Sequence, residues 1–409
     1  MTNDLSLISI TQAEQLIGDA LSALPAVPVP LAQAAGRVLR QEVVAERDQP
    51  PFDRVMMDGI AIDSSAIAAG LRQFTLAGTQ SAGDIPLVLP NNHSCIEIMT
   101  GAVLPIGCDA VIPVERISIS ADQAILEDGL QVGRGQHIHP QGSDYLQAAS
   151  LLAAGCLIRA PEQAVLASSG VTEVLVSPLL TAGIISPGNE LVQPGEPIAA
   201  HQIWRSNDLA VAAALASRGD LSTICYPVAD DRDKVAAQIK TVLAENDCLI
   251  LCGAVSKGKY DFVPAVLAEC GVQKVFHRVA QRPGKPLWFG VSANGKPVFA
   301  LPGNPVSVLA CTARYVVPAL DILRAAKNLT RYQIPLSKAI DFDSALGWLL
   351  AVHLTVSEDG ELAAVPQLTN TSGDFAGLSG ADGIVELPAA QQHFPAGYRA
   401  AFYPWGGAV

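Results

Sequence analysis

Between about residues 180 and 326, short uninterrupted apolar runs alternate with segments whose apolar residues recur at helical spacing. The runs have the length of buried strands, whereas segments 209–217 and 234–245 have the spacing of helices. Strands that alternate with helices predict a doubly wound α/β domain, in which ligands bind at the carboxyl ends of the strands. The predicted strands are residues 182–186, 223–228, 248–252 and 298–301.

The regions before and after this domain favour β-structure. Residues 48–140 contain short apolar runs separated by glycine. After Tyr332, apolar and polar positions alternate again, with a hairpin turn predicted at 358–360 and a strand at 383–387. A small β-barrel or sandwich fits this last region.

The chain is expected to open with a helix. Thr11 and Glu14 have the spacing of a capping box, and the apolar residues that follow share one helical face. Pro25 ends the pattern.

Length, charge and cysteine content narrow the class of protein. At 409 residues the chain should form several domains, and a formal charge of −13 argues against nucleic acid as its main partner. We find no secretion signal, and every long uncharged run is broken by Pro, Gly or Ser, which predicts no membrane span. Eight cysteines without a CxxC pair favour reduced, mostly buried thiols and a cytoplasmic location.

Three turns in the α/β region have the composition of anion-binding turns. In the stretch 300–307, Pro302 and Pro305 fix two φ angles, and Gly303 permits close approach of the backbone. Pro305 suits the first position of a helix, whose free N–H groups would face an anion together with Ser307. The segments 252–261 and 282–286 are the other two turns. Together they favour a phosphate-bearing ligand.

Carboxylates follow successive predicted strands of the same region. Glu190, Asp230 and Asp261 each lie just after a strand, although such a residue is often only a solvated loop charge, and Asp231 has the position of a helix cap. Carboxylates beside phosphate-binding turns would repel the ligand unless a cation lies between them. The arrangement therefore suggests a site for Mg²⁺.

The β-rich region adds two unusual loops and a histidine pair. Residues 50–59 place two carboxylates in a loop that begins with proline, and Thr100 follows a predicted strand directly. Both segments also fit ordinary surface turns. His137 and His139 flank one residue, but no third metal ligand is evident, so a solvated pair is the simpler interpretation.

These residues, in this order, resemble the molybdopterin molybdenumtransferase family, of the bacterial MoeA and gephyrin E-domain type. The resemblance covers nearly the full chain. Its motifs are Met57-Asp58-Gly59, the segment 98–102, Gly142 with Asp144, Gly188 with Glu190, Ser206-Asn207, Asp230-Asp231, Val255-Ser256 with Gly258 and Asp261, the segment 283–286, and the segment 301–305.

The resemblance implies a multidomain α/β plus β fold. It consists of a discontinuous elongated domain (1–47 and 141–178), an inserted β-rich domain (48–140), an α/β molybdopterin- and nucleotide-binding domain (179–326) and a C-terminal β-barrel domain (327–409). It also implies a homodimer whose cleft lies between the α/β domain of one subunit and the β domain of the other. The implied reaction inserts molybdate into adenylated molybdopterin with Mg²⁺ and releases AMP. The implied protein partners are the molybdopterin adenylyltransferase and recipient molybdoenzymes.

The resemblance further implies roles for individual residues. The second subunit would contribute Asp58 and Thr100, whereas Glu190, Asp230 and Asp261 would hold Mg²⁺ or position the adenylated ligand. The implied catalytic residues are Asp58, Thr100, Asp144, Glu190, Asp230 and Asp261. The resemblance implies that the molybdate pocket is lined by Pro302, Gly303, Pro305 and Ser307. The other residues implied to bind the ligand are Gly253, Ser256, Gly258, Arg282 and Lys285.

The chain departs from the usual motifs, which leaves other hypotheses open. An active molybdenumtransferase is one interpretation, and a non-catalytic molybdopterin-binding paralogue that acts as carrier, scaffold or regulator is another. An enzyme acting on another nucleotide, or on tungstate instead of molybdate, is a third. The departures are Val55, Ser143, Pro187, Asn189, Ala254 and Lys257.

Overall fold

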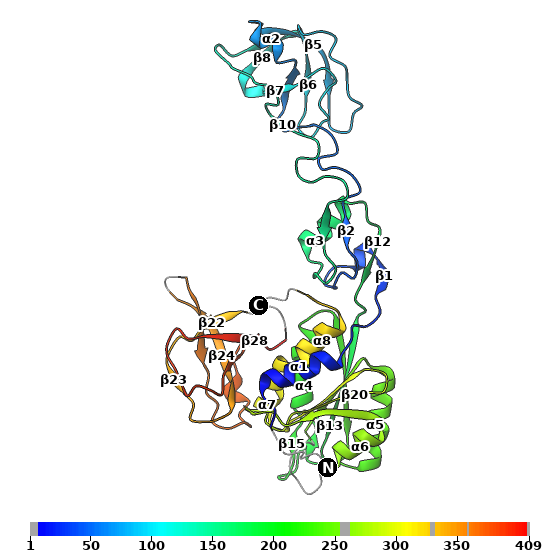
Figure 1. Cartoon of the computed structure of the whole chain (residues 1–409), viewed down its shortest axis with the longest axis vertical. Helices are drawn as coiled ribbons and strands as arrows, with labels where there is room; N and C mark the ends of the chain where they lie inside the picture. Colours follow the sequence, from blue (N-terminus) through cyan, green and yellow to red (C-terminus); the bar gives the residue numbers. More distant parts are fainter. Residues whose placement is uncertain (1–6, 254–261, 328–331, 358–359, 407–409) are drawn as a thin grey trace. The chain divides into compact units, whose positions relative to one another are not determined.

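The computed structural model describes residues 7–253, 262–327, 332–357 and 360–406. The chain folds into two compact units, each built from segments that are distant in sequence (Figure 1). The larger unit consists of Met1–Gln41, Ala154–Gln163 and Thr172–Val409, and the smaller unit of Glu42–Ala153 and Ala164–Val171. Both ends of the chain therefore belong to the larger unit.

A six-stranded sheet forms the centre of the larger unit. Its spatial order is β16 (Leu221–Val228), β13 (Leu180–Pro187), β17 (Cys248–Cys252), β21 (Pro297–Leu301), β20 (Trp288–Ser292) and β18 (Val272–His277). The first four strands are parallel, β20 runs antiparallel to β21, and β18 runs antiparallel to β20. Strands β17 and β21 are buried along their whole length, as expected where helices cover both faces of a sheet. The four predicted strands are confirmed.

The predicted helices of this domain are present as α4 (Asn207–Ala216) and α5 (Arg232–Glu245), and α6 (Val263–Glu269) follows β17. The start of α5 is set by Asp231, whose carboxylate accepts hydrogen bonds from the backbone N–H groups of Asp233 and Lys234 at 3.1 and 2.9 Å. Asp231 is therefore a helix cap, one of the two roles that its position allowed.

The opening helix, α1 (Ile10–Ala20), begins one residue earlier than its expected cap at Thr11. Its capping box is formed by Ser9 and Gln12 instead, with reciprocal hydrogen bonds of 3.1 and 2.8 Å. The prediction that Thr11 and Glu14 form the box was wrong, because Ile10 already belongs to the buried face of the helix and Thr11 therefore lies in its first turn.

One continuous helical run follows β21. It comprises α7 (Pro305–Cys311), a π-helical turn η3 (Thr312–Val316) and α8 (Val317–Leu323). Within the described residues, this run is the only helix long and apolar enough to cross a bilayer by length and composition, but 72% of it is buried inside the fold. Its burial is that of a core helix.

A β-barrel follows this helix (orange to red in Figure 1). Its strands, in spatial order, are β22 (Gln333–Pro335), β28 (Arg399–Pro404), β26 (Gly383–Leu387), β24 (Gly347–Val356) and β25 (Leu362–Pro366). A bridge between Leu336 and Ala364 joins the two outer strands and closes the ring. The short strand β19 (Gln281–Arg282), which belongs to the α/β region, pairs in parallel with β24.

The smaller unit contains a second six-stranded sheet, in the order β7 (Ala110–Pro113), β4 (Gly59–Ile62), β6 (Ser94–Ile98), β5 (Gln73–Gln80), β9 (Gln123–Leu126) and β8 (Ile117–Ser120). A helical turn, α2 (Ser65–Ala68), covers part of its core. Gly59 is required where β4 begins, because a Cβ there would lie 1.9 Å from the carbonyl oxygen of Ile112 on β7.

Short paired strands and one further helix complete the two units. Helix α3 (Ala160–Ser168) lies where the chain passes from one unit to the other. The antiparallel pairs are β1 (Val27–Pro30) with β12 (Glu173–Val176), β2 (Val43–Val44) with β11 (Ser150–Leu152), β3 (Arg54–Val55) with β10 (Ile138–His139), and β23 (Ile340–Asp341) with β27 (His393–Phe394). Strands β14 (Leu191–Val192) and β15 (Ile203–Trp204) are parallel. The four-domain boundaries stay a prediction.

All eight cysteines lie in the described part of the chain as free thiols, as predicted. Five are buried and three are partly exposed. Burial raises the pKa values of Cys95, Cys108 and Cys311 to about 12. These three thiols are therefore neutral and poorly nucleophilic at physiological pH.

Candidate functional site

Two glycine turns meet at the carboxyl edge of the α/β sheet. The N–H of Gly253, after β17, donates to the carbonyl oxygen of Leu301 at 3.0 Å. A Cβ on Gly303, after β21, would lie 3.8 Å from the Cα of Gly253. The amide of Asn207, at the start of α4, donates to the Gly303 carbonyl at 2.8 Å. Turns that the sequence places about 50 residues apart are therefore neighbours.

Glu190 and Asp230 also lie at this edge, because β13 and β16 are adjacent parallel strands that end in register. The side-chain oxygen of Asn189 accepts a hydrogen bond from the N–H of Asp230 at 3.1 Å, which ties the two loops together. Both carboxylates are exposed. The structure thus brings two of the three predicted metal ligands onto neighbouring loops.

The remaining residues predicted around the first glycine turn lie outside the described part of the chain: Ala254, Ser256, Lys257, Gly258 and Asp261. Over the described ranges, no three His, Cys, Asp or Glu side chains are grouped closely enough to hold a metal ion. The assignment of Asp261 as a metal ligand accordingly stays a prediction.

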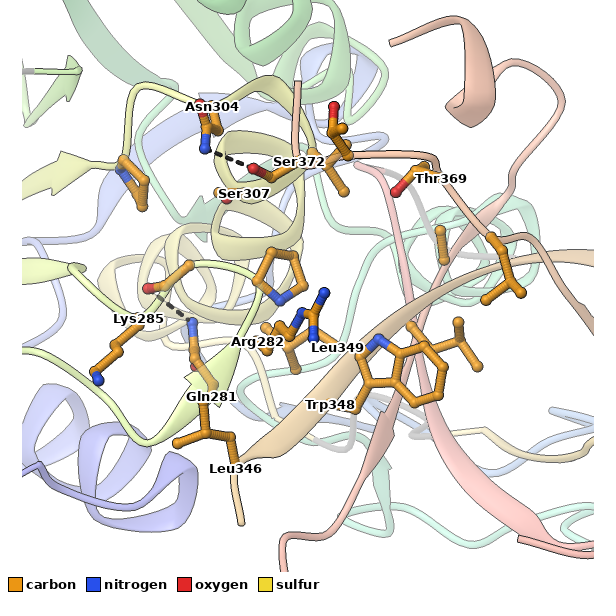
Figure 2. A pocket seen from close by; sticks show the side chains of 18 of the residues that line it. Gln281, Arg282, Lys285, Asn304, Ser307, Leu346, Trp348, Leu349, Thr369 and Ser372 are labelled. Atoms are coloured by element: carbon orange, nitrogen blue, oxygen red, sulfur yellow. Dashed lines mark hydrogen bonds between the residues drawn. The ribbon is translucent and has the colours of Figure 1, made fainter. Parts of the chain in front are cut away.

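A cavity of about 550 Å³ opens between the α/β region and the barrel within the larger unit (Figure 2). We call it the Arg282 cavity. The predicted residues Arg282, Lys285, Pro302 and Ser307 line it, whereas Gly303 and Pro305 do not. Arg282 and Lys285 are exposed cations, and Ser307 lies in the first turn of α7. The barrel contributes Phe342, Leu346, residues 348–351 and residues 367–372 to the wall.

The N-terminal end of α7 is bonded to the barrel beside this cavity. Pro305 occupies its first turn and has no N–H to satisfy, and the N-cap residue Asn304 makes no capping hydrogen bond to the helix. Instead, the Asn304 amide donates to the Ser372 hydroxyl of the barrel at 2.6 Å. The N–H of Val306 donates to the carbonyl of the same serine at 3.1 Å. These bonds fix the barrel loop against the helix start and close one side of the cavity.

The loop that carries Arg282 and Lys285 rests on a buried polar contact. Gln281 is fully buried, its amide N–H donates to the Gly284 carbonyl at 3.2 Å, and its carbonyl oxygen accepts a hydrogen bond from the Tyr315 hydroxyl. Burial raises the pKa of Tyr315 well above its ordinary value, so the phenol stays protonated as the donor. The conformation of the loop therefore depends on η3, which lies beneath it.

The residue before Tyr315 in η3, Arg314, joins three parts of the larger unit. Its guanidinium donates to Glu386 of β26 at 2.6 Å and to Glu14 of α1 at 2.7 Å, and it lies 4.7 Å from the ring centroid of Tyr403. Burial alone lowers the pKa of Arg314, but Tyr403 and the two carboxylates outweigh burial and raise it. The side chain is therefore a permanent cation that links η3 to α1 and to the barrel.

The sequence pattern did not indicate Gln281, Tyr315 or Arg314 as supports of the cavity. One signal was available, because a charged residue stands at position 314 within the apolar segment 305–323. A buried charge requires a partner, which marks the position as one with a specific contact.

In the smaller unit, the structure brings Asp58 and Thr100 together. One carboxylate oxygen of Asp58 accepts from both the N–H and the hydroxyl of Thr100, at 2.7 and 2.6 Å. Both hydrogen bonds favour the charged carboxylate and lower the pKa of Asp58. The aspartate and threonine, 42 residues apart, thus form one anionic group on the surface of this unit.

Asp144 lies in a second polar chain of the same unit. His139 is 3.0 Å from Asp144 through Nε2 and 3.0 Å from an Arg54 Nη atom through Nδ1. Because a guanidinium only donates, Nδ1 accepts and Nε2–H donates to the carboxylate. His139 is therefore held by Arg54 and Asp144, and Arg54 is held in turn by its contact with His139.

We expect replacement of Thr100 by valine to raise the pKa of Asp58 toward its ordinary value. The variant removes the hydroxyl donor and retains the backbone N–H, so the shift should be partial. The carboxylate signal of Asp58 in a ¹³C NMR pH titration measures this change. Asp63, whose pKa is lowered by Ser65 in the same unit, serves as an internal reference and should not move. An unchanged titration midpoint of Asp58 would show that the hydrogen bond from the Thr100 hydroxyl does not affect the pKa of this carboxylate.

Comparison with known proteins decides the family. The model of the MoeA N-terminal region (domains I and II) matches residues 8–170, and that of a probable molybdopterin binding domain matches residues 183–322. A molybdopterin molybdenumtransferase from Synechocystis is 37% identical over 90% of this chain and 93% of its own. The chain belongs to the molybdopterin molybdenumtransferase family. It is, with its relatives, a transferase of molybdenum cofactor biosynthesis.

Other members of the molybdopterin molybdenumtransferase family match over similar lengths. The relative from Synechococcus elongatus is 31% identical and covers 96% of this chain and 98% of its own. The crystal structure of a molybdopterin biosynthesis MoeA protein from Pyrococcus horikoshii covers 98% of this chain and 100% of its own, with a TM-score of 0.81 and 25% identity. These matches confirm the predicted fold class. Arg282, Lys285 and Ser307 fall within the matched molybdopterin binding domain, whereas the barrel side of the Arg282 cavity lies beyond it.

Proposed function

We propose that this protein inserts molybdate into adenylated molybdopterin and releases AMP, with Mg²⁺ as the metal cofactor. The observation that carries the proposal is the Arg282 cavity, which places two cationic side chains and the start of α7 around one space. This cavity lies beside the carboxyl edge of a sheet whose sequence matches a molybdopterin binding domain. A tetrahedral oxyanion is the type of ligand that such a site stabilises.

The side chains of the cavity supply charge and orientation. The reaction brings molybdate and the phosphates of the adenylated ligand together, so negative charge accumulates. Arg282 and Lys285 lower the electrostatic cost of this approach, and Ser307 donates or accepts a hydrogen bond at the oxyanion. The buried Gln281 holds the loop in place, so little reorganisation is needed when the ligand arrives.

The donor chemistry at the sheet edge fits Mg²⁺. Glu190 and Asp230 offer carboxylate oxygens on neighbouring loops, and oxygen ligands are those that this ion prefers. We assign Asp261 as the third carboxylate from the family resemblance. When bound, the ion would neutralise phosphate charge. The residues themselves orient the adenylate end of the ligand, with Gly253 leaving room for a phosphate.

The proposal extends to the assembly. Asp58 and Thr100 of the second subunit of a homodimer would complete the cleft. Asp144, which contacts His139 in the same unit, is proposed as a further catalytic residue. The adenylyltransferase that makes the substrate and the molybdoenzymes that receive the product are its proposed protein partners. We propose a cytoplasmic location, which the eight free thiols support.

The test is molybdate-dependent AMP release from adenylated molybdopterin by the purified protein with Mg²⁺. We expect Lys285→Ala to reduce this rate by about 10²-fold, the effect of removing one preorganised charge at a developing anion. Lys338→Ala, at an exposed lysine outside the cavity, is the matched control and should retain the wild-type rate. Equal rates of AMP release for the two variants would show that the cavity takes no part in the reaction.

A carrier or scaffold role is the second candidate, favoured by the altered motif that places Asn189 beside Asp230. Tight binding of the adenylated ligand by the wild-type protein, without AMP release at any molybdate concentration, would support that role. AMP release that requires molybdate would exclude it.

A further inference from the structure

Two stacked aromatic side chains line the barrel side of the Arg282 cavity. The rings of Phe342 and Trp348 have centroids 4.4 Å apart and an angle of 19° between their planes. The guanidinium carbon of Arg282 lies 5.9 Å from the centroid of Phe342. A cation and two aromatic rings are therefore gathered at one wall of the cavity, and no residue role proposed above uses the rings.

The backbone fixes the position of the indole. Arg282 of β19 and Trp348 of β24 are direct partners in a parallel strand pair, so they stand side by side where the α/β region joins the barrel. Figure 2 shows the indole and the guanidinium extending into the same cavity. Phe342 is almost fully buried, whereas Trp348 is only partly buried. Trp348 therefore retains ring surface that the fold does not cover.

The opposite wall can recognise the edge of a flat heterocycle. The barrel loop after β25 contributes Thr369, Asn370 and Thr371, whose side chains both donate and accept hydrogen bonds. Bonds from Asn304 and Val306 to Ser372 hold this loop in place. A cavity of about 550 Å³ is within the range of small-molecule sites that combine an aromatic wall with a few polar groups.

We propose that Trp348, backed by Phe342, is the platform on which the pterin ring of the substrate stacks. This inference rests on the proposed function, because it assigns one part of that ligand to one wall of the cavity. The sulfur atoms that receive the metal are carried on the ring fused to the pterin, whereas the adenylate is attached at the far end through phosphate. A ring stacked beside the Arg282 and Lys285 oxyanion site is therefore the pterin, and the adenine lies farther away.

Calorimetric titration of the full-length protein with 6-hydroxymethylpterin, and separately with AMP, tests the assignment. Loss of a stacking partner typically weakens binding by about tenfold or more, so we expect Trp348→Leu to weaken pterin binding by about that factor. Trp348→Phe keeps an aromatic face and should bind pterin within about threefold of wild type. The affinity for AMP should be the same in all three proteins.

Trp204→Leu is the matched control, because Trp204 is 52% exposed and lies outside the cavity. It should leave pterin binding unchanged. Thermal unfolding midpoints of the variants identify any loss of fold, and Trp348→Phe gives a second reading if Trp348→Leu is unstable.

The outcomes separate this inference from the proposed function. Pterin binding by Trp348→Leu equal to wild type overturns the platform and leaves the transferase proposal intact. Weakened AMP binding with unchanged pterin binding would place the adenine on the indole and overturn the assignment. A wild-type protein that binds neither pterin nor AMP would overturn the proposed function itself, and the platform with it.

Discussion

Replacement of Arg314 by methionine is expected to lower the free energy of unfolding by about 3–5 kcal/mol, the usual cost of removing one partner from a buried ion pair. Arg314 is 2% exposed and bonded to Glu14 and Glu386, so the variant takes a buried guanidinium away from two partly buried carboxylates. It also removes the cation that lies over the ring of Tyr403. Chemical denaturation monitored by circular dichroism measures the change.

Two further variants show whether unpaired charge is the cause. Arg399→Met changes an exposed arginine on β28 and should alter stability by less than about 1 kcal/mol. Glu386→Gln, added to Arg314→Met, should recover part of the loss because position 386 then carries no charge that needs the guanidinium. If Arg314→Met is as stable as Arg399→Met, the buried network does not hold the barrel and α1 to the α/β region.

The second large effect is expected for Gly284→Ala, in the loop of the Arg282 cavity. Gly284 has a φ of +88°, and a Cβ there would lie 2.5 Å from the Sγ of Cys311 and 2.8 Å from the amide nitrogen of Gln281. The left-handed backbone should cost about 1–2 kcal/mol and the collision about 1–3 kcal/mol more. Relief of the collision displaces Gln281, which holds the loop of the cavity. The affinity for molybdate, measured by calorimetry, should therefore fall together with the free energy of unfolding.

Gly295→Ala separates these two costs. Gly295 has a φ of +77° but no atom within 4 Å of the Cβ position, so this variant should show the backbone cost alone and unchanged molybdate binding. In the Gly284→Ala background, Cys311→Ala removes the nearest colliding atom and should restore part of the stability. Equal losses for the two glycine variants would show that the contact with Cys311 has no weight.

The sequence was sufficient to predict the sheet and the turns at its edge, because both follow from local pattern. Buried parallel strands require continuous apolar runs, as in β17 and β21, and the turns after them must be polar. Once the strands are parallel, their carboxyl ends share one edge. The proximity of Gly253 to Gly303 and of Glu190 to Asp230 follows from that topology and not from any local signal.

The side-chain contacts that hold the walls of the cavity in place could not be predicted from local sequence pattern. Gln281 and Tyr315 are 34 residues apart, and Arg314 and Glu14 are 300 residues apart, so no spacing rule relates them. The partnership of Phe342 with Trp348 likewise depends on the closure of the barrel. At the first helix, Ser9 and Thr11 are both good caps, and only the packing of Ile10 selects between them.

The contact between Glu14 and Arg314 has a consequence for synthesis of the chain on the ribosome. Helix α1 buries Ile10, Ala13 and Ile17 against residues of the α/β sheet and the barrel. Arg314, the partner of the Glu14 carboxylate, is translated 300 residues after it. At roughly 5–20 residues per second, Glu14 waits about 15–60 s for Arg314 to be synthesised. The whole smaller unit is translated during that interval and is free to fold first. The packing of α1 is therefore expected to be one of the last steps in the folding of this protein.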